Sequence, residues 1–239
     1  MSAAARRLRA LAGNVPVERA VQIVAGRLLD GVACPPTDLV ALSARVGVGE
    51  LREEDLPIAG TLLHDGSQLV IVSATHLSHA RRRFTIAHEI GHALFEATGA
   101  NPPRAGRELE RLCDMLATEF LLPRDVFIAH AGAMPSLHHV FALAKLFDAS
   151  LSATAIRCCE VGQVSAFEIE GSTLRWARGI ARSVTAALAP AVHKALCGER
   201  VDDKVLLSDR GVPREWRLEG APIASPARKR ALFLLRPYA

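Results

Sequence analysis

The spacing of hydrophobic residues along the chain changes from a helical period to alternation, and this change predicts the order of the secondary structure. In the first two-thirds of the chain, apolar residues recur every three or four positions in segments that end near proline or glycine. These segments predict helices at 17–29, 39–46, 76–96, 107–122, 124–131, 137–147 and about 150–159. The first part of the chain is therefore expected to be mainly helical.

One β-hairpin interrupts these helices. The apolar runs 60–63 and 68–72 flank His64-Asp65-Gly66-Ser67, and Asp-Gly is a strong signal for a tight turn. Further on, alternation predicts four strands, at 165–169, 174–177, 215–218 and 231–235. A helical period predicts one more helix at 184–196. We expect an α+β protein with a mainly helical domain over 1–160, whose core starts near residue 17, and a smaller α+β module over 161–239.

Composition indicates a packed globular protein, since 50% of the 239 residues are hydrophobic and 23% are charged. No stretch of about 18 uninterrupted apolar residues predicts a membrane span, and the amino terminus lacks the apolar core of a secretory signal. The five cysteines are scattered without a CxxC pair, which favours a reducing compartment over a disulfide framework. We expect a cytoplasmic protein with no membrane partner.

The formal charge of +4 is only mildly basic. Arginine and lysine cluster at 6–9, 81–83 and 228–230, where they could contact phosphate, although such runs are more often solvated surfaces. Direct contact with DNA therefore remains an alternative that the sequence does not decide.

The main chemical motif is His88-Glu89-Ile90-Gly91-His92 within the predicted helix 76–96. Helical spacing puts the two imidazoles on one face, where both can bind one Zn²⁺, and Glu89 then lies beside the open position of the metal. A water molecule on zinc has its pKa lowered toward about 7, so Glu89 could accept its proton and later pass it to a leaving amine. Gly91 is expected to leave space beside the metal. Two histidines on an apolar helix can also be buried and hydrogen-bonded without any metal.

A catalytic zinc needs a third protein ligand, and the predicted helix 107–122 offers Glu108, Glu110 and Asp114 on or near one face. Glu110 is preferred because Asp114, one turn further, could accept the second ring N–H of a ligating histidine. Glu108 remains the alternative ligand. The Glu110 and Asp114 pair is similar to the gluzincin pattern of thermolysin-like peptidases.

The segments RRFTIAHEIGHAL (82–94) and ERLCDMLATEFLLP (110–123) closely resemble the ImmA/IrrE family of metallopeptidases. Members of that family typically show an R-R-F-T-x-A-H-E-x-G-H core, followed by a helix of the type E-x-x-A-N-x-F-A-x-x-L-L-M-P. The likeness spans about 17–159, and Cys113-Asp114 replaces the usual Ala-Asn.

This resemblance implies a zincin-like domain with one zinc ion, in which His88, His92 and Glu110 are ligands and Glu89 is the base. It implies a hydrolase that cleaves a helix-turn-helix transcriptional repressor in a stress or mobile-element response, with 161–239 as a regulatory or substrate-binding module. The alternative is a metal-containing sensor that sequesters a repressor without cleaving it, or a member of a toxin-antitoxin pair. His₂Glu ligation also accepts other divalent ions, although the motif favours zinc.

Overall fold

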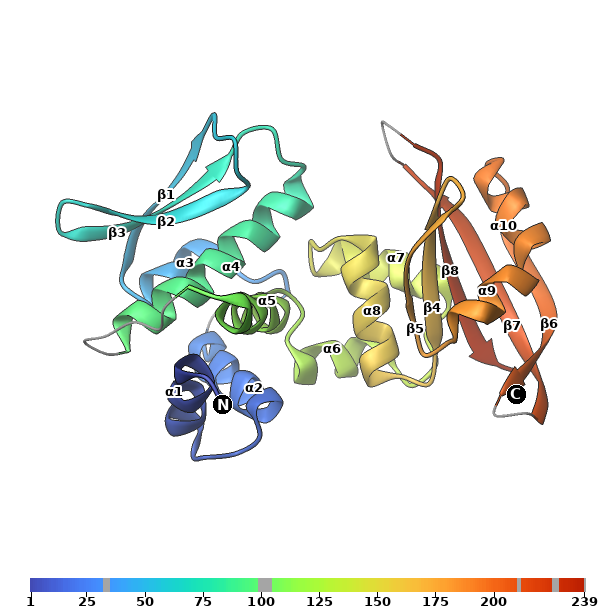
Figure 1. Ribbon diagram of the computed structural model, residues 1–239, viewed down its shortest axis with the longest axis horizontal. Helices are drawn as coiled ribbons and strands as arrows, with labels where there is room; N and C mark the ends of the chain where they lie inside the picture. The colour runs from blue at the N-terminus through green and yellow to red at the C-terminus, as the bar shows by residue number, and fades with distance from the viewer. Residues whose placement is uncertain (32–34, 99–104, 210–211, 225–227, 239) are drawn as a thin grey trace. The chain divides into compact units, whose positions relative to one another are not determined.

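The computed structural model describes residues 1–31, 35–98, 105–209, 212–224 and 228–238 (Figure 1). Helices and two sheets make up the protein, which confirms the α+β class. The chain divides into two compact units: unit 1 comprises 1–127 and 146–150, and unit 2 comprises 128–145 and 151–239. This division falls earlier in the chain than the boundary at residue 160 that the sequence suggests.

Unit 1 contains a group of helices and a small sheet. Its helices are α1 (Ala3–Ala12), α2 (Val17–Leu29), α3 (Leu39–Ala44), α4 (His79–Ala97), α5 (Arg107–Leu121) and the first turn of α6 (Arg124–Ala131). Local sequence sets several of their ends: the Asp38 side chain accepts hydrogen bonds from the first turn of α3, and Pro123 follows α5. The helix α1 is absent from the sequence-based prediction, because its arginines obscure the apolar face formed by Ala4, Ala5, Leu8 and Ala12.

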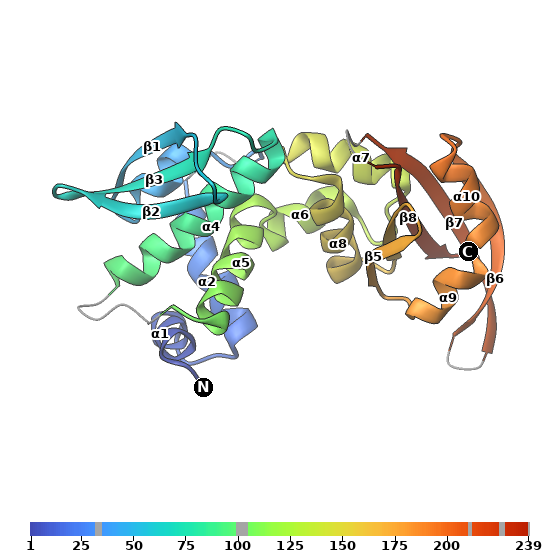
Figure 2. The same ribbon diagram turned by 45° about the horizontal axis from the view of Figure 1, so that its top comes forward.

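The sheet of unit 1 consists of β1 (Val48–Glu54), β2 (Gly60–Asp65) and β3 (Gln68–Ala74). The strands β2 and β3 form the predicted hairpin, and β1 pairs parallel with β3 to give the order β1-β3-β2. Figures 1 and 2 both show α4 running along one face of this sheet. The strand β2 therefore lies at an edge of the sheet and next to the helix that carries the HExxH motif.

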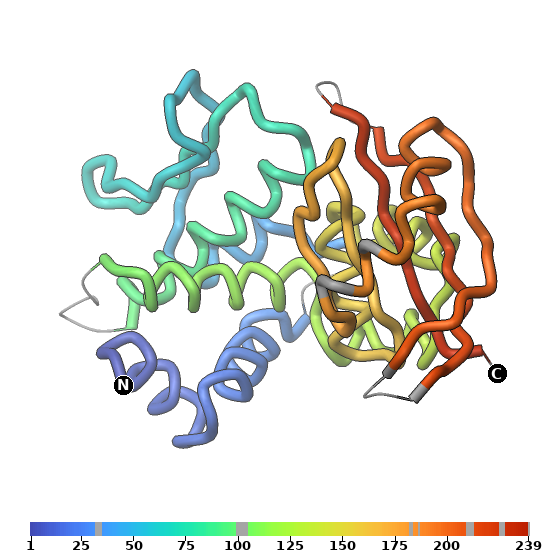
Figure 3. The backbone as a smooth tube through the Cα atoms, turned by 45° about the vertical axis from the view of Figure 1, so that its right-hand side comes forward, coloured from blue at the N-terminus to red at the C-terminus, as the bar shows by residue number. Residues whose placement is uncertain are grey.

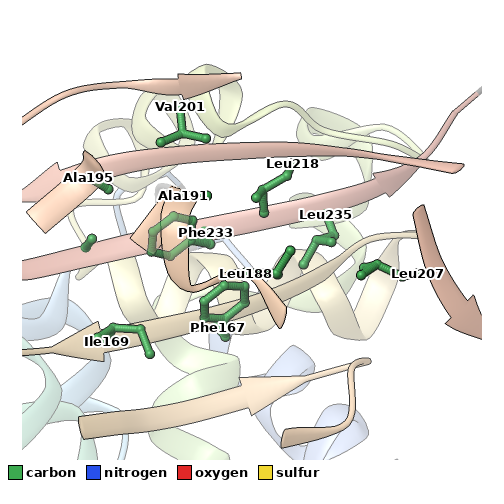
Figure 4. Close-up of a cluster of buried hydrophobic side chains, with 11 residues drawn as sticks. Phe167, Ile169, Leu188, Ala191, Ala195, Val201, Leu207, Leu218, Phe233 and Leu235 are labelled. Atoms are coloured by element: carbon green, nitrogen blue, oxygen red, sulfur yellow. The ribbon is translucent and has the colours of Figure 1, made fainter. Parts of the chain in front are cut away.

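Unit 2 contains a five-stranded antiparallel sheet of order β5-β4-β8-β7-β6. Its elements are α7 (Leu137–Leu146), α8 (Leu151–Val161), β4 (Ser165–Glu170), β5 (Thr173–Arg178), α9 (Arg182–Ala187), α10 (Ala189–Leu196), β6 (Val201–Asp209), β7 (Val212–Ile223) and β8 (Arg230–Pro237). The helices α9 and α10 lie along one face (Figure 3, orange), where the buried Phe167 and Phe233 rings stack at a centroid distance of 4.7 Å (Figure 4). On the other face, α8 reaches the sheet through a hydrogen bond from Ser152 to Glu168.

Two predictions for unit 2 need correction. The predicted helix 184–196 is divided into α9 and α10, because Pro190 lacks a backbone N–H and fits only the first turn of a helix. The strand β6 was not predicted at all, since the charged residues Asp202, Asp203 and Lys204 hide its alternation.

Several arginines that the sequence offers for phosphate contact are bonded within the protein. Arg7 donates to the carbonyl of Phe95 at 2.8 Å, and Arg230 pairs with the buried Glu168. Arg82 and Arg83 likewise donate to backbone carbonyls of unit 1. Glu53 and Asp148 also form ion pairs with Arg82 and Arg83, so acidic neighbours offset part of the charge of these arginines.

Among the described residues, no single helix is long and apolar enough to cross a membrane. One bent pair, α7 with α8, passes the same test by length and composition, with an angle of 114° between the two helices.

We expect Gly220→Ala to destabilise the protein by about 1–3 kcal/mol through overpacking. A Cβ atom at Gly220 would lie 2.5 Å from Cε1 of Phe233 and 3.2 Å from Cβ of Val201, inside the core of unit 2. The control is Gly49→Ala on β1, where the close contacts of the new atom are Oε1 and Cδ of Gln68, the end of a flexible side chain that can move away. Thermal denaturation of both variants checks this, and equal melting temperatures would contradict it.

Candidate metal centre

The helix α4 holds both histidines of the motif on one face. The four-residue spacing brings Nε2 of His88 and Nε2 of His92 to 3.1 Å from each other. The two side chains are 16% and 21% exposed, so their nitrogens are accessible without being fully solvated. This helix face thus presents two nitrogen donors to one point in space.

The helix α5 packs against α4 and adds two carboxylates. Glu110 lies 3.2 Å from Nε2 of His88 and 3.5 Å from Nε2 of His92. Asp114 lies on the other side of the His88 ring, with Oδ1 2.9 Å from Nδ1. Within the described part of the chain, the group of potential metal ligands is His88, His92 and Glu110, whose ligand atoms all lie within 4.8 Å of one another. Glu108 is not part of this group.

The donor atoms are close enough together to share one ion. Nε2 of His88 lies 3.1 Å from Nε2 of His92, Oε2 of Glu110 lies 3.2 Å from the first nitrogen, and Oε1 of Glu110 lies 3.5 Å from the second. Ligands at about 2.0–2.1 Å from a tetrahedral ion lie about 3.3 Å from each other, so small side-chain adjustments suffice to place one oxygen and both nitrogens around an ion. Because a carboxylate only accepts hydrogen bonds, the contact with Asp114 favours a proton on Nδ1 of His88, and Nε2, which faces Glu110, is then the nitrogen that can bind a metal ion. A cation at the centre stabilises this arrangement, so His88, His92 and Glu110 can bind a metal ion.

Gly91 has a different role from the one that the sequence suggests. A Cβ atom at this position would lie 3.1 Å from Cα and 3.2 Å from Cβ of Cys113 on α5. The space beside Gly91 is therefore filled by the neighbouring helix, and the prediction that it lies open beside the metal is wrong. Gly91 lets α4 and α5 approach closely enough for Glu110 to reach the histidines.

The environment of Glu89 raises its pKa above the ordinary value for a glutamate. Burial is the largest cause, and the positive charge of His92 and His88 partly offsets it. The backbone N–H of Leu62 on β2 also forms a hydrogen bond with the Glu89 carboxylate. A carboxylate with a raised pKa is suited to accept a proton and to release it again.

His88 titrates above the ordinary pKa of histidine. Burial lowers its pKa, but the hydrogen bond to Asp114 and the charges of Asp114, Glu89 and Glu110 together outweigh that effect. Protons therefore compete with a metal ion for Nε2 of His88 at mildly acidic pH.

Two features of the site are missing from the sequence-based prediction. One is the Leu62 backbone, which sequence cannot place because backbone groups leave no motif. The other is Phe84, one turn before His88, whose ring lies 6.4 Å from the imidazole and is covered by the Arg81 guanidinium. The helical spacing of Phe84 and His88 is the signal that could have placed this ring at the site.

A match to a known family indicates a metallopeptidase-like domain. Residues 46–158 match the sequence profile of peptidase family M78, described as the IrrE N-terminal-like domain, and this part of the chain belongs to that family. Comparison with curated proteins gave no match.

Among solved structures, a Mycobacterium tuberculosis transcriptional regulator is similar, with a TM-score of 0.62 and 14% sequence identity. The alignment covers 98% of this chain and 79% of that one. At this identity the likeness concerns the fold alone.

We expect Asp114→Ala to weaken zinc affinity about 10- to 100-fold, because the His88 ring loses the acceptor that fixes its tautomer. Glu108→Ala is the matched control on the same helix and should leave the affinity unchanged. Competition titration against a zinc chelator measures both. Equal affinities for the two variants would show that Asp114 does not support the site.

Gly91→Ala should lower zinc affinity as well as stability, because α5 has to move away from α4. Gly26→Ala in α2 is the control: nothing lies within 4 Å of the new atom, so alanine should stabilise that helix by about 0.5–1 kcal/mol. Chelator competition and thermal denaturation report the two effects. Normal zinc affinity in Gly91→Ala would mean that the helix spacing does not control the site.

Proposed function

We propose that the protein is a zinc-dependent endopeptidase. The single observation that carries this proposal is the convergence of His88, His92 and Glu110 within 4.8 Å, with the partly buried Glu89 on the same helix. Two imidazoles and one carboxylate are the protein ligands of a large class of catalytic zinc sites, which keep a fourth position open.

The chemistry that zinc supplies when bound is the polarisation of a carbonyl group and the acidification of water. Glu89 takes the proton from the attacking water molecule and delivers it to the amine that leaves. Its raised pKa favours this exchange in both directions. Asp114 keeps His88 oriented, and Glu110 contributes negative charge that tightens the binding of a cation.

The edge strand β2 supports a peptide as the substrate. Leu62 lies opposite Ile71 of β3, and its backbone N–H bonds to Glu89, so the free edge of β2 faces the site. An extended peptide can add to such an edge through main-chain hydrogen bonds, which would present its backbone to Glu89. Leu63 on β2 is 37% exposed and adds apolar surface along this strand.

As the natural substrate we propose a helix-turn-helix transcriptional repressor. The IrrE-like family match supports this class. Unit 2 would then serve substrate binding or regulation.

The Glu89→Gln variant should bind one zinc per chain, as the wild type does, yet lose cleavage by at least about a hundredfold, since only the base is removed. His88→Ala should lose both zinc and cleavage. Elemental analysis and cleavage of purified helix-turn-helix repressors from the same genome are measured on the same samples.

These results separate two functions. Cleavage that persists in Glu89→Gln would exclude the proposed mechanism. Zinc binding without cleavage in the wild type, together with cellular activity of Glu89→Gln, would favour sequestration of a repressor. Wild-type protein without zinc would show that the histidines are structural.

A further inference from the structure

Unit 2 contains a pocket of about 370 Å³, a volume within the range of about 300–1,000 Å³ that is usual for small-molecule sites. His138 and Phe141 of α7 line one side of it, and residues 219–221 of β7 line another. Arg200 and the first residues of β6 complete the lining. Of the described residues that line the pocket, none belongs to the metal centre.

The two acids of this lining are already paired within the protein. Asp202 accepts hydrogen bonds from Nε and from an Nη atom of Arg217, at 2.7 and 2.5 Å, and this contact lowers the pKa of the Asp202 carboxyl. Glu219 accepts a hydrogen bond from the backbone N–H of Leu137 at 2.8 Å and another from Arg236 at 3.2 Å. The negative charge of both acids is therefore compensated by neighbouring groups.

The Arg200 guanidinium is the charged group of this lining that lacks a partner. It is exposed, and no residue in the described part of the chain forms a hydrogen bond or an ion pair with it. The His138 imidazole is likewise exposed and unpaired among the described residues. Glu199, which precedes Arg200 in the chain, does not line the pocket. The uncompensated charge of the pocket is therefore positive.

We propose that this pocket binds a small organic carboxylate with an apolar or aromatic part. A guanidinium matches a carboxylate in shape, so Arg200 can donate two parallel hydrogen bonds to it, and an N–H of His138 can add a third. The half-buried Phe141 ring offers a surface to the apolar part of the ligand. By comparison with benzene in a cavity of roughly 150 Å³, the volume admits about 10 to 15 non-hydrogen atoms.

The test compares 3-phenylpropionate with 3-phenylpropionamide, which have nearly the same shape and differ in the negative charge. The full-length protein should bind the acid with a Kd on the order of 1 mM. It should bind the amide about tenfold more weakly, because a hydrogen bond between two charged groups is stronger than one to a neutral acceptor. Calorimetric titration measures both. In ¹⁵N NMR spectra, the acid should shift the backbone signals of Gly220 and Ala221, which line the pocket.

Arg200→Gln should weaken binding of the acid about tenfold and leave binding of the amide and the melting temperature unchanged, since Arg200 is exposed and unpaired. Arg178→Gln is the matched control. It removes the same charge from β5, at the opposite edge of the sheet from β6, and should bind the acid as the wild type does. A carboxylate can also bind a metal ion, so His88→Ala is a second control and should keep the wild-type Kd for the acid.

Equal affinity for the acid and the amide would overturn the proposal, as would a wild-type Kd for the acid in Arg200→Gln. Loss of acid binding in His88→Ala with retention in Arg200→Gln would place the probe at the metal centre and would also refute it. The proposed site is independent of peptide cleavage. Failure of this test therefore leaves the zinc and cleavage measurements on Glu89→Gln unaffected.

Discussion

The metal centre depends on the contact between Gly91 of α4 and Cys113 of α5. Glycine has no side chain, so the backbone of α5 approaches so closely that a Cβ atom at this position would lie 3.1 Å from Cα of Cys113 and would push α5 away by a few tenths of an ångström. Glu110 lies three residues before Cys113 and Asp114 one residue after it. The distance between α4 and α5 at Cys113 therefore determines how far these two carboxylates lie from the histidines. The His88 ring is held between these two acids, at 3.2 and 2.9 Å.

This close packing brings several negative charges near one another. The carboxylates of Glu89, Glu110 and Asp114 gather around His88 and His92, and burial of Glu89 already raises its pKa. A positive charge at the centre relieves their repulsion, and either a proton on a histidine or a metal ion can provide it. A divalent ion provides more charge and also uses the nitrogen lone pairs, so metal binding is coupled to the stability of unit 1.

Sequence reasoning succeeded where structure follows from local spacing. The Asp65-Gly66 turn predicted the β2–β3 hairpin, and helical spacing put Glu110 and Asp114 one turn apart on the same helix. The packing of α5 against α4 brings both carboxylates to His88. It failed where distant segments decide the outcome. The function of Gly91 depends on a residue on another helix, and the parallel pairing of β1 with β3 leaves no local pattern. The roles of the site residues as zinc ligands and base remain predictions.

Two buried polar groups in unit 2 differ in whether they have hydrogen-bond partners. Glu168 is fully buried, and its carboxylate accepts hydrogen bonds from Ser152, Trp176 and Arg230, so its charge is compensated within the fold. Trp216 has an equally buried donor without such a partner. Nε of Arg236, on the neighbouring strand β8, is another buried donor without an acceptor among the described residues. The Glu168 network is therefore the part of this sheet in which buried polar groups are compensated within the fold.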